Sequence, residues 1–350
     1  MSLASIATLA AERAPLPDAV LRIGVGLMVG RTRERLDAGV GIGDGDFATR
    51  MIARPIAENT SEANAQHYEV PSSFFRLVLG PRLKYSSALY DDGVSTLAEA
   101  EDRALAETCA HADLADGQSI LELGCGWGSL SLWMAERYPA SRITAVSNSR
   151  SQRALIEAQA NARQLMNLTV ITADMNDFTP EHRFDRVVSV EMFEHMSNWR
   201  ALLGRVAGWL NPGGRLFLHV FTHRSRPYRF DLADRDDWIA RHFFSGGIMP
   251  SHGLIRQFPD LFEVEDEWRW SGEHYRRTAE DWLANFGAAS REIDDVFQCV
   301  YGSDAALWKR RWRLFFLATA GLFGDQGGAA WGVSHYRLKP ALASAGSAVN

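Results

Sequence analysis

The feature that most constrains the fold is a glycine-rich turn at residues 119–138, SILELGCGWGSLSLWMAERY. A short apolar run ends at Gly124. Gly126 and Gly128 follow, and a helical pattern of apolar residues comes next. This order predicts a strand, a tight turn and a helix. In such a turn the backbone approaches a ligand closely, and N–H groups at the start of the helix face it. The segment therefore predicts a site for a nucleotide-like cofactor.

The spacing of the glycines separates two classes of cofactor. Dinucleotide sites use G-x-G-x-x-G and an acid about 20 residues further on. This chain has G-x-G-x-G, and its next predicted strand ends in Ser147, Asn148 and Ser149 without a carboxylate. Glu122 stands two positions before the first glycine, and E-x-G-x-G-x-G is the pattern of class I S-adenosylmethionine (SAM) methyltransferases. The pattern favours SAM over NAD, while a purely structural turn remains the alternative.

Composition limits the class of protein further. The chain has 350 residues, 46% hydrophobic and 23% charged, which is typical of a globular protein. Its net charge of −6 gives no basic footprint for nucleic acid. The three cysteines are far apart and odd in number, which indicates neither a disulfide framework nor a metal site. No basic signal-peptide region begins the chain, and the apolar run 314–323 is too short to cross a bilayer. We expect a cytoplasmic protein without a stable membrane anchor, which could form a homodimer.

From residue 119 onward, predicted strands alternate with predicted helices. Strands are expected at 119–123, 142–146, 168–172, 184–190 and 215–221, with helices at 128–138, 150–165 and 198–210. This alternation is typical of βαβ units in a parallel sheet. Two later strands, at 262–270 and 331–338, enclose helices expected near 277–298 and 304–323. The sequence thus predicts an α/β fold with a seven-stranded, Rossmann-like sheet.

The whole chain is expected to divide into three regions, and the second of them contains an insertion. Residues 1–63 are expected to form an N-terminal helical extension, with a helix at 16–39 and irregular chain at 40–60. The main domain is expected at 64–340, and 341–350 as a disordered tail. Residues 222–259 interrupt the alternation after the fifth strand. We expect this insertion near the carboxyl ends of the strands, where ligands bind in open α/β sheets, and infer that it covers the substrate.

Two segments with acidic residues carry candidate chemistry. Glu191, Glu194 and His195 follow the fourth strand in VVSVEMFEHM, and spacings of three and four predict one side of a helical turn. A histidine among two carboxylates can orient an amine and take its proton. The alternative is a solvated acidic start of a helix. Asp174 ends the third strand in ITADM, where it can accept the adenine amino group or merely cap a turn.

Seven collinear blocks give the chain a resemblance to a known family. They are HYEVPSSFFRLVLG, LKYSSALY, LELGCGWGSLSLW, VSVEMFEHM, FFSGGIMPS, GEHYRRTAEDW and YGSDAALWKRRWRLFFLATAGLFG. Over residues 64–340 the chain resembles the cyclopropane fatty acid synthase superfamily of SAM methyltransferases, and within it the coclaurine N-methyltransferase branch. The resemblance implies a class I methyltransferase fold that transfers a methyl group from SAM to a small amine. Cyclic or aromatic amines of the tetrahydroisoquinoline type are implied, with S-adenosylhomocysteine (SAH) as the product.

The resemblance also implies which residues surround SAM. Tyr85 and Ser86 would meet its methionine group, and Glu122 would support the glycine turn beneath it. Asn148 and Gln152 would reach the ribose. The full set implied for the cofactor is Tyr85, Ser86, Glu122, Gly124, Gly126, Gly128, Asn148, Gln152, Asp174 and Met175, of which the last two would contact adenine.

For the acceptor, the resemblance assigns two sets of residues. Glu191, Glu194 and His195 match the amine-binding and catalytic positions of the family. The insertion and the helix around Tyr275 supply candidate aromatic residues for the pocket, each of which could equally be plain core. These candidates are Trp238, Phe243, Phe244 and Tyr275.

One position separates the branches of the superfamily. Where the lipid enzymes typically have a small residue, usually glycine, this chain and the coclaurine-like enzymes have a glutamate, here Glu191. The lipid enzymes also use bicarbonate as a base, held partly by a cysteine at the position of Ser87. Cysteine is usual there in the plant enzymes too, so the chain departs from both patterns. The other positions that match the bicarbonate site, Glu194, His219 and Tyr275, remain. Methyl or methylene transfer to an unsaturated lipid therefore stays open, as does a non-catalytic SAM-binding module.

Overall fold

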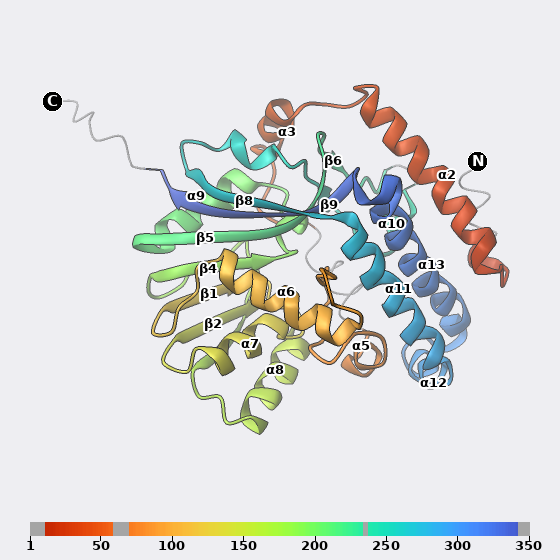
Figure 1. Cartoon of the computed structure of the whole chain (residues 1–350), viewed down its shortest axis with the longest axis horizontal. Coiled ribbons are helices and arrows are strands. Elements are labelled where there is room, and N and C mark those ends of the chain that lie inside the picture. Colours follow the sequence, from red (N-terminus) through yellow and green to blue (C-terminus); the bar gives the residue numbers. More distant parts are fainter. Residues whose placement is uncertain (1–10, 59–69, 234–236, 342–350) are drawn as a thin grey trace.

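A seven-stranded sheet forms the centre of the computed structural model, which describes residues 11–58, 70–233 and 237–341 (Figure 1). The strand order is β3-β2-β1-β4-β5-β9-β8, and β9 runs antiparallel to both of its neighbours. The strands are β1 (Ser119–Leu123), β2 (Arg142–Ser147), β3 (Leu168–Thr172), β4 (Phe184–Val190), β5 (Leu210–His223), β8 (Phe262–Ser271) and β9 (Trp331–Pro340). The predicted seven-stranded α/β fold is confirmed.

Helices cover both faces of this sheet. They are α3 (Asp44–Met51), α6 (Leu97–His111), α7 (Ser129–Arg137), α8 (Arg150–Ala162) and α9 (Trp199–Trp209). Successive side chains of β1 enter different cores, because they point to opposite faces of the sheet. Ile120 packs with residues of α6 and α7, whereas Leu121 packs with residues of α3 and α9. A strand buried on both faces reads as a continuous apolar run, which is why β1 was recognisable from the sequence.

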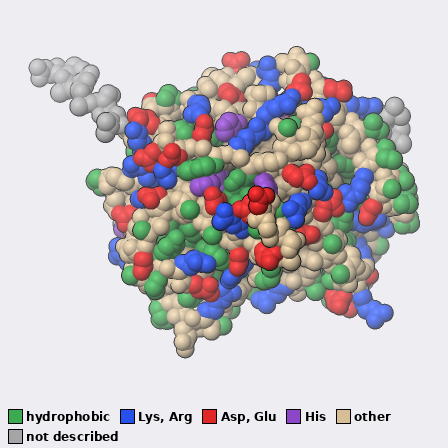
Figure 2. All heavy atoms as spheres, in the orientation of Figure 1, with side chains coloured by type: hydrophobic (Ala, Val, Ile, Leu, Met, Phe, Trp, Pro, Cys, Tyr) green, Lys and Arg blue, Asp and Glu red, His purple; other side chains and the backbone are tan. Residues whose placement is uncertain are grey.

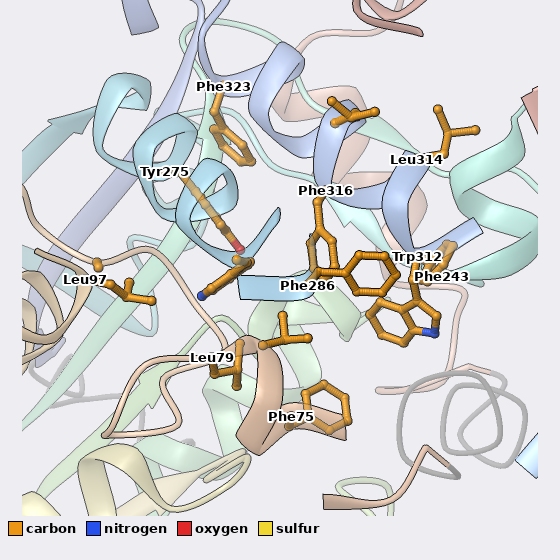
Figure 3. Packing of buried hydrophobic residues seen from close by; sticks show 14 of the residues in the cluster. Phe75, Leu79, Leu97, Phe243, Tyr275, Phe286, Trp312, Leu314, Phe316 and Phe323 are labelled. Carbon is orange, nitrogen blue, oxygen red and sulfur yellow. The ribbon is translucent and has the colours of Figure 1, made fainter. Parts of the chain in front are cut away.

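A second group of helices stands at one end of the sheet, on the right in Figure 1. We call α2 (Asp18–Asp37), α5 (Ser72–Val78), α11 (Gly272–Ala288), α12 (Ser290–Tyr301) and α13 (Ala305–Phe323) the helical cap. Its core is largely aromatic (Figure 3), with the Phe74 and Trp312 ring centroids 4.7 Å apart. α2 lies directly on α13, since a Cβ added to Gly321 would come 2.4 Å from Val25. Figure 2 shows charges of both signs interspersed over one face of the molecule. An ion pair between Arg22 and Glu280 joins α2 to α11.

The insertion after β5 has structure of its own. It contains β6 (Tyr228–Arg229), α10 (Trp238–His242) and β7 (Ile248–Met249), and β6 pairs with β7. Beyond α10, the ring of Phe243 stacks on Phe315 of α13, with centroids 4.5 Å apart. The insertion therefore folds back against the helical cap.

Three expectations about local structure were wrong. The single helix expected at 277–298 is two helices, because Ala289, with φ −91° and ψ 25°, interrupts the helical path between α11 and α12. The segment 40–60 is not wholly irregular, since it includes α3, whose Phe47 and Met51 are buried. Glycine and aspartate around these two residues had hidden the helical pattern. β5 is longer than expected, because the Asn-Pro-Gly-Gly turn forms a register shift within the strand.

Some of the expected boundaries lie outside the described residues. These are residues 1–10 and 59–69 of the N-terminal extension and its junction, and 342–350 of the expected tail. Within the part of the chain that the structure describes, no helix combines the length and hydropathy that a membrane crossing requires.

Candidate active site

A cavity of about 1120 Å³ lies between the sheet and the helical cap. On one side it is bounded by the turns that follow β1, β2 and β3, which we call the sheet side. On the other side it is bounded by α2, α13 and residues 227–249 of the insertion, which we call the cap side. The carboxyl ends of the parallel strands open into this space, which is where ligands bind in open α/β sheets.

The glycine turn shapes the sheet side of the cavity. Gly124 and Gly126 line it, both with positive φ. A Cβ on Gly124 would come 2.5 Å from the side chain of Met192, so the close approach excludes any larger residue. Gly128 acts differently, because it begins α7 with φ +85° and a Cβ there would come 2.6 Å from Ile156 of α8. Two of the three predicted glycines thus face the cavity, and the third allows α7 and α8 to pack.

Glu122 supports the turn from below. Its Oε2 accepts a hydrogen bond from Ser131 Oγ of α7, which ties β1 to the helix after the turn. Burial raises the pKa of the Glu122 carboxyl to about 7. The structure thus places Glu122 beneath the turn, and its role in supporting a bound cofactor stays a prediction.

The other residues expected to hold the cofactor line the same cavity. They come from the chain before α6, from the ends of β2 and β3 and from the first turn of α8: Tyr85, Ser86, Asn148, Gln152, Asp174 and Met175. Gln152 is the most informative, because its Oε1 accepts from Ser147 Oγ while its buried Nε2 has no partner among the described residues. A buried donor of this kind costs free energy unless a ligand pairs with it. Asp174 also binds Asn176, so the turn-capping alternative holds for part of its carboxylate.

Glu191 is held at the junction of the two sides by hydrogen-bonding groups from three separate segments. Its Oε1 accepts from the Ser87 backbone N–H at 2.9 Å and lies 3.1 Å from His219 Nε2, and its Oε2 accepts from Tyr275 OH at 2.7 Å. The expected helical turn is wrong here, because Glu191 has φ +47° and precedes a short 3₁₀ turn, Phe193–His195. These three convergent groups fix the carboxylate at the cavity wall.

Burial raises the pKa of Glu191, and the nearby ammonium of Lys84 opposes that shift. Lys84 is itself buried, with a pKa lowered to about 8, and its Nζ donates to Ser86 Oγ and the Ser87 carbonyl. Lys84 was not among the residues predicted for the site. A signal for it exists, since a lysine within the apolar block LKYSSALY, directly before Tyr85, has to be buried and paired.

Glu194 and His195 lie in different environments. His195 lines the cavity with its ring 4.4 Å from that of Phe244, and burial lowers its pKa to about 4 against the opposing field of Glu191. Glu194 is fully buried outside the cavity lining, where its Oε1 accepts from the Phe221 N–H at 2.7 Å. Burial and the charge of Glu191 raise the Glu194 pKa well above its ordinary value. The spacing had predicted that the three residues share one face of a helical turn. In the structure they do not.

The predicted pocket aromatics also divide. Trp238, Phe244 and Tyr275 line the cavity. Phe243 does not: it is fully buried beside Trp312 and Phe315 of the helical cap (Figure 3). Neighbouring residues at a helix end point in different directions, which the sequence alone did not resolve. α13 adds a lining that was not predicted, because its block of family resemblance supported membership of the family and no residue in it was assigned to the pocket. Its cavity residues are Leu314, Phe315, Ala318, Thr319, Leu322 and Phe323.

Comparison with known proteins places this geometry in a family. The family described as mycolic acid cyclopropane synthetase matches residues 57–327. (S)-coclaurine N-methyltransferase of Thalictrum flavum subsp. glaucum is 36% identical over 289 residues, covering 81% of this chain and 80% of that protein. Cyclopropane-fatty-acyl-phospholipid synthase of Escherichia coli K12 is 30% identical over 260 residues, covering 74% of this chain and 63% of that protein.

Among solved structures, the similarity extends over nearly the whole chain. The crystal structure of coclaurine N-methyltransferase bound to N-methylheliamine and SAH superposes with a TM-score of 0.90 at 32% identity. The match covers 96% of this chain and 99% of that one. The similarity therefore includes the helical cap and the insertion as well as the sheet.

Proposed function

Since the chain belongs to the mycolic acid cyclopropane synthetase family and is a SAM-dependent methyltransferase, we propose that it methylates the nitrogen of a small amine. The acceptor class that we propose is a cyclic or aromatic amine of the tetrahydroisoquinoline type. The observation that carries the proposal is the Glu191 carboxylate, held at the wall of a largely apolar cavity by Ser87, His219 and Tyr275.

A carboxylate in this position suits an amine better than a lipid. An ammonium entering the cavity gains an ion pair with Glu191 in surroundings that screen charge poorly. The aromatic side chains of Trp238 and Phe244 on the cap side offer apolar faces to the ring system of such a ligand. A hydrocarbon chain gains nothing from an additional carboxylate, which would have to be desolvated beside it.

The sheet side has the groups that SAM requires. Gly124 and Gly126 allow a ligand to lie against the backbone, and the buried Gln152 Nε2 offers a hydrogen bond to a hydroxyl oxygen. Bound there, SAM supplies a methyl group made electrophilic by its sulfonium. The protein mainly has to hold the amine nitrogen in line with that methyl group, and such positioning contributes several kcal/mol.

The amine must also lose a proton, because an ammonium has no lone pair. Glu191 attracts the ammonium, and His195 beside it is neutral near pH 7, since its pKa is about 4. His195 takes the proton from the amine. Because burial raises the pKa of Glu191 and lowers that of His195, the proton comes to rest on Glu191. Glu194, which makes no contact with the cavity, positions the segment through Phe221.

The lipid reaction is the second candidate, favoured by membership of the family and by the E. coli relative. One feature of the site argues against it. The backbone N–H of Ser87, the ring of His219 and the hydroxyl of Tyr275 belong to positions that match the bicarbonate site of the lipid enzymes, and all three bind Glu191. The Glu191 carboxylate thus binds the groups that would otherwise hold bicarbonate.

The test is SAH formation by the purified protein with two sets of acceptors. One set contains tetrahydroisoquinolines and simple arylethylamines, and the other contains liposomes of unsaturated phospholipid. Turnover with cyclic amines and none with liposomes supports the proposal. Turnover with liposomes alone, retained in Glu191→Ala and lost in Glu194→Ala, would replace it with the lipid reaction.

A further inference from the structure

Three buried histidines, His219, His335 and His111, form a hydrogen-bonded line behind Glu191. The proposed reaction assigns no role to this line. His219 Nε2 lies 3.1 Å from Glu191 Oε1, and His219 Nδ1 lies 2.8 Å from His335 Nε2. His335 Nδ1 lies 2.8 Å from His111 Nδ1, and His111 Nε2 lies 3.0 Å from Glu107 Oε1. Both ring nitrogens of every histidine in the line are therefore engaged.

The line leads from the cavity to the surface. Glu191 lines the cavity, and His219 and His335 are fully buried. The side chain of His111 is 10% exposed and that of Glu107 is 29% exposed. The residues come from four elements: the end of β4, β5, β9 and α6. His219 and His335 are direct partners across β5 and β9, and Glu107 lies one turn before His111 in α6.

We propose that Glu191, His219, His335, His111 and Glu107 form a proton relay, through which the proton of the acceptor ammonium leaves the active site. The inference rests on the proposed amine N-methylation. It adds the route by which the proton reaches solvent without opening the cavity.

Counting protons supports the relay. Three neutral imidazoles contribute three N–H groups, whereas the line has four gaps to bridge. When Glu191 is protonated, every N–H points outward: His219 Nδ1–H to His335, His335 Nδ1–H to His111, and His111 Nε2–H to Glu107. When Glu191 is ionised, the first three gaps are bridged by N–H groups that point inward. The ionised order contains one proton fewer, and each of its three N–H groups has moved to the other nitrogen of the same ring.

The transfer consists of balanced steps. The Glu191 O–H bond breaks as His219 Nε2–H forms, and His219 Nδ1–H breaks as His335 Nε2–H forms. His335 Nδ1–H then breaks as His111 Nδ1–H forms, and His111 gives its Nε2 proton to Glu107 and so to water. One proton enters and one leaves, and each ring ends neutral. The rings must then exchange tautomers before the next turnover.

The surroundings keep the inner rings neutral and pack closely around them. Burial lowers the pKa of both His219 and His335 well below the ordinary value, and the Lys84 ammonium acts in the same direction. A proton therefore passes through these rings without resting there. The His335 ring packs against Trp270, and the His111 ring stacks on Trp268 with centroids 3.8 Å apart.

The outer ring has a different environment. Glu107 and Asp266 favour the charged form of His111, whereas burial and Arg337 disfavour it, with a net lowering of its pKa. The two carboxylates make the surface end the more favourable place for a proton along the line of imidazoles. The charges that face the line are thus Lys84 at the inner end and Glu107, Asp266 and Arg337 at the outer end.

The first test compares the pH profile of kcat/KM for tetrahydroisoquinoline in wild type, His335→Gln and His111→Gln, in dilute buffer. At pH 7 the acceptor is an ammonium, and we expect both variants to be slower by about 10-fold or more, part of the ~10²–10⁴-fold that positioned proton transfer contributes. Above the pKa of the amine, the acceptor arrives neutral and the variants should converge with wild type. Added imidazole buffer should restore the rate of His111→Gln, because His111 lies at the surface end of the line, where buffer can accept the proton in its place.

Two further variants separate a relay from a structural role. His223→Gln, at a fully buried histidine of the same strand β5 that lies outside the line, should keep the wild-type profile. Glu107→Gln changes the exposed end with little risk to folding, and should slow the reaction at pH 7 in a way that buffer reverses. An unchanged profile in both His335→Gln and His111→Gln, or an equal loss at every pH without rescue, would overturn the relay.

A second readout does not depend on activity. Nitrogen-15 NMR reports which ring nitrogen of each histidine carries the proton. As Glu191 ionises with rising pH, the protons of His219 and His335 should move together from Nδ1 to Nε2 with one midpoint. Fixed tautomers through that transition would reject the relay even if no amine were a substrate. Concerted exchange without amine turnover would instead reject the proposed acceptor and retain the relay.

Discussion

The sheet side and the cap side of the cavity are built in different ways. On the sheet side, the turn after β1 is a short local segment, in which Glu122 binds Ser131 across the glycines. On the cap side, α2, the insertion and α13 meet although they are far apart in sequence. A turn made of one local motif can be recognised from its spacing. A side made of distant helices depends on packing and can differ between relatives that share the same motif.

The largest effect is expected where the two sides meet. Glu191→Ala and His195→Ala should each lower kcat for a cyclic amine by about 10²–10⁴-fold, because they remove the groups that hold and deprotonate it. SAM affinity should stay near wild type, since the sheet side is unchanged. Calorimetric titration with SAM and initial-rate kinetics measure the two quantities separately. Full turnover in both variants would remove these residues from the mechanism.

Next in size is the contrast between two neighbouring phenylalanines on the cap side. Phe243→Ala should lower the free energy of unfolding by about 3–5 kcal/mol, because it empties a packed site beside Trp312 and Phe315. Phe244→Ala, at the cavity wall, should cost less stability and instead raise KM for the amine. Denaturant unfolding and kinetics of the matched pair check both halves. A larger KM effect from Phe243→Ala would contradict the division between core and pocket.

On the sheet side, Glu122 should make the free energy of unfolding of the protein depend on pH. Its pKa is raised from 4.5 in the reference state to about 7, so the protonated form is favoured in the folded protein. Its contribution is fully present below pH 4.5 and is lost as pH rises through 7. Relative to wild type, Glu122→Gln should therefore gain stability over this interval. Urea unfolding at several pH values measures the difference, and a constant offset between the two proteins would show that Glu122 does not titrate there.

The smallest effect is expected at the outer surface of the cap. Arg22 and Glu280 make two short hydrogen bonds between α2 and α11, but both side chains are partly exposed. Arg22→Ala should therefore change stability by less than about 1 kcal/mol. Val25→Asp, on the buried face of α2 opposite Gly321, should cost several times more. Comparable losses from the two variants would mean that ion pairs, rather than apolar packing, hold α2 on α13.

The sequence by itself determined the elements of the sheet, the turn at Gly124 and Gly126, and the place of Glu191 and His195 after β4. These features follow from local rules: buried strands read as apolar runs, and a tight turn needs glycine. α3 and the break at Ala289 escaped the same rules, because short or interrupted helices leave little periodic signal.

Only the tertiary structure decided which groups surround those residues. Ser87, Tyr275 and His219 reach Glu191 from 104, 84 and 28 positions away, and no local pattern links them. It also turned Glu194 and Phe243 away from the cavity and brought His111, His219 and His335 into one line. The physical reason is that chain neighbours share a backbone path, whereas contacts between distant elements arise when β5, β9 and the helices pack into one core.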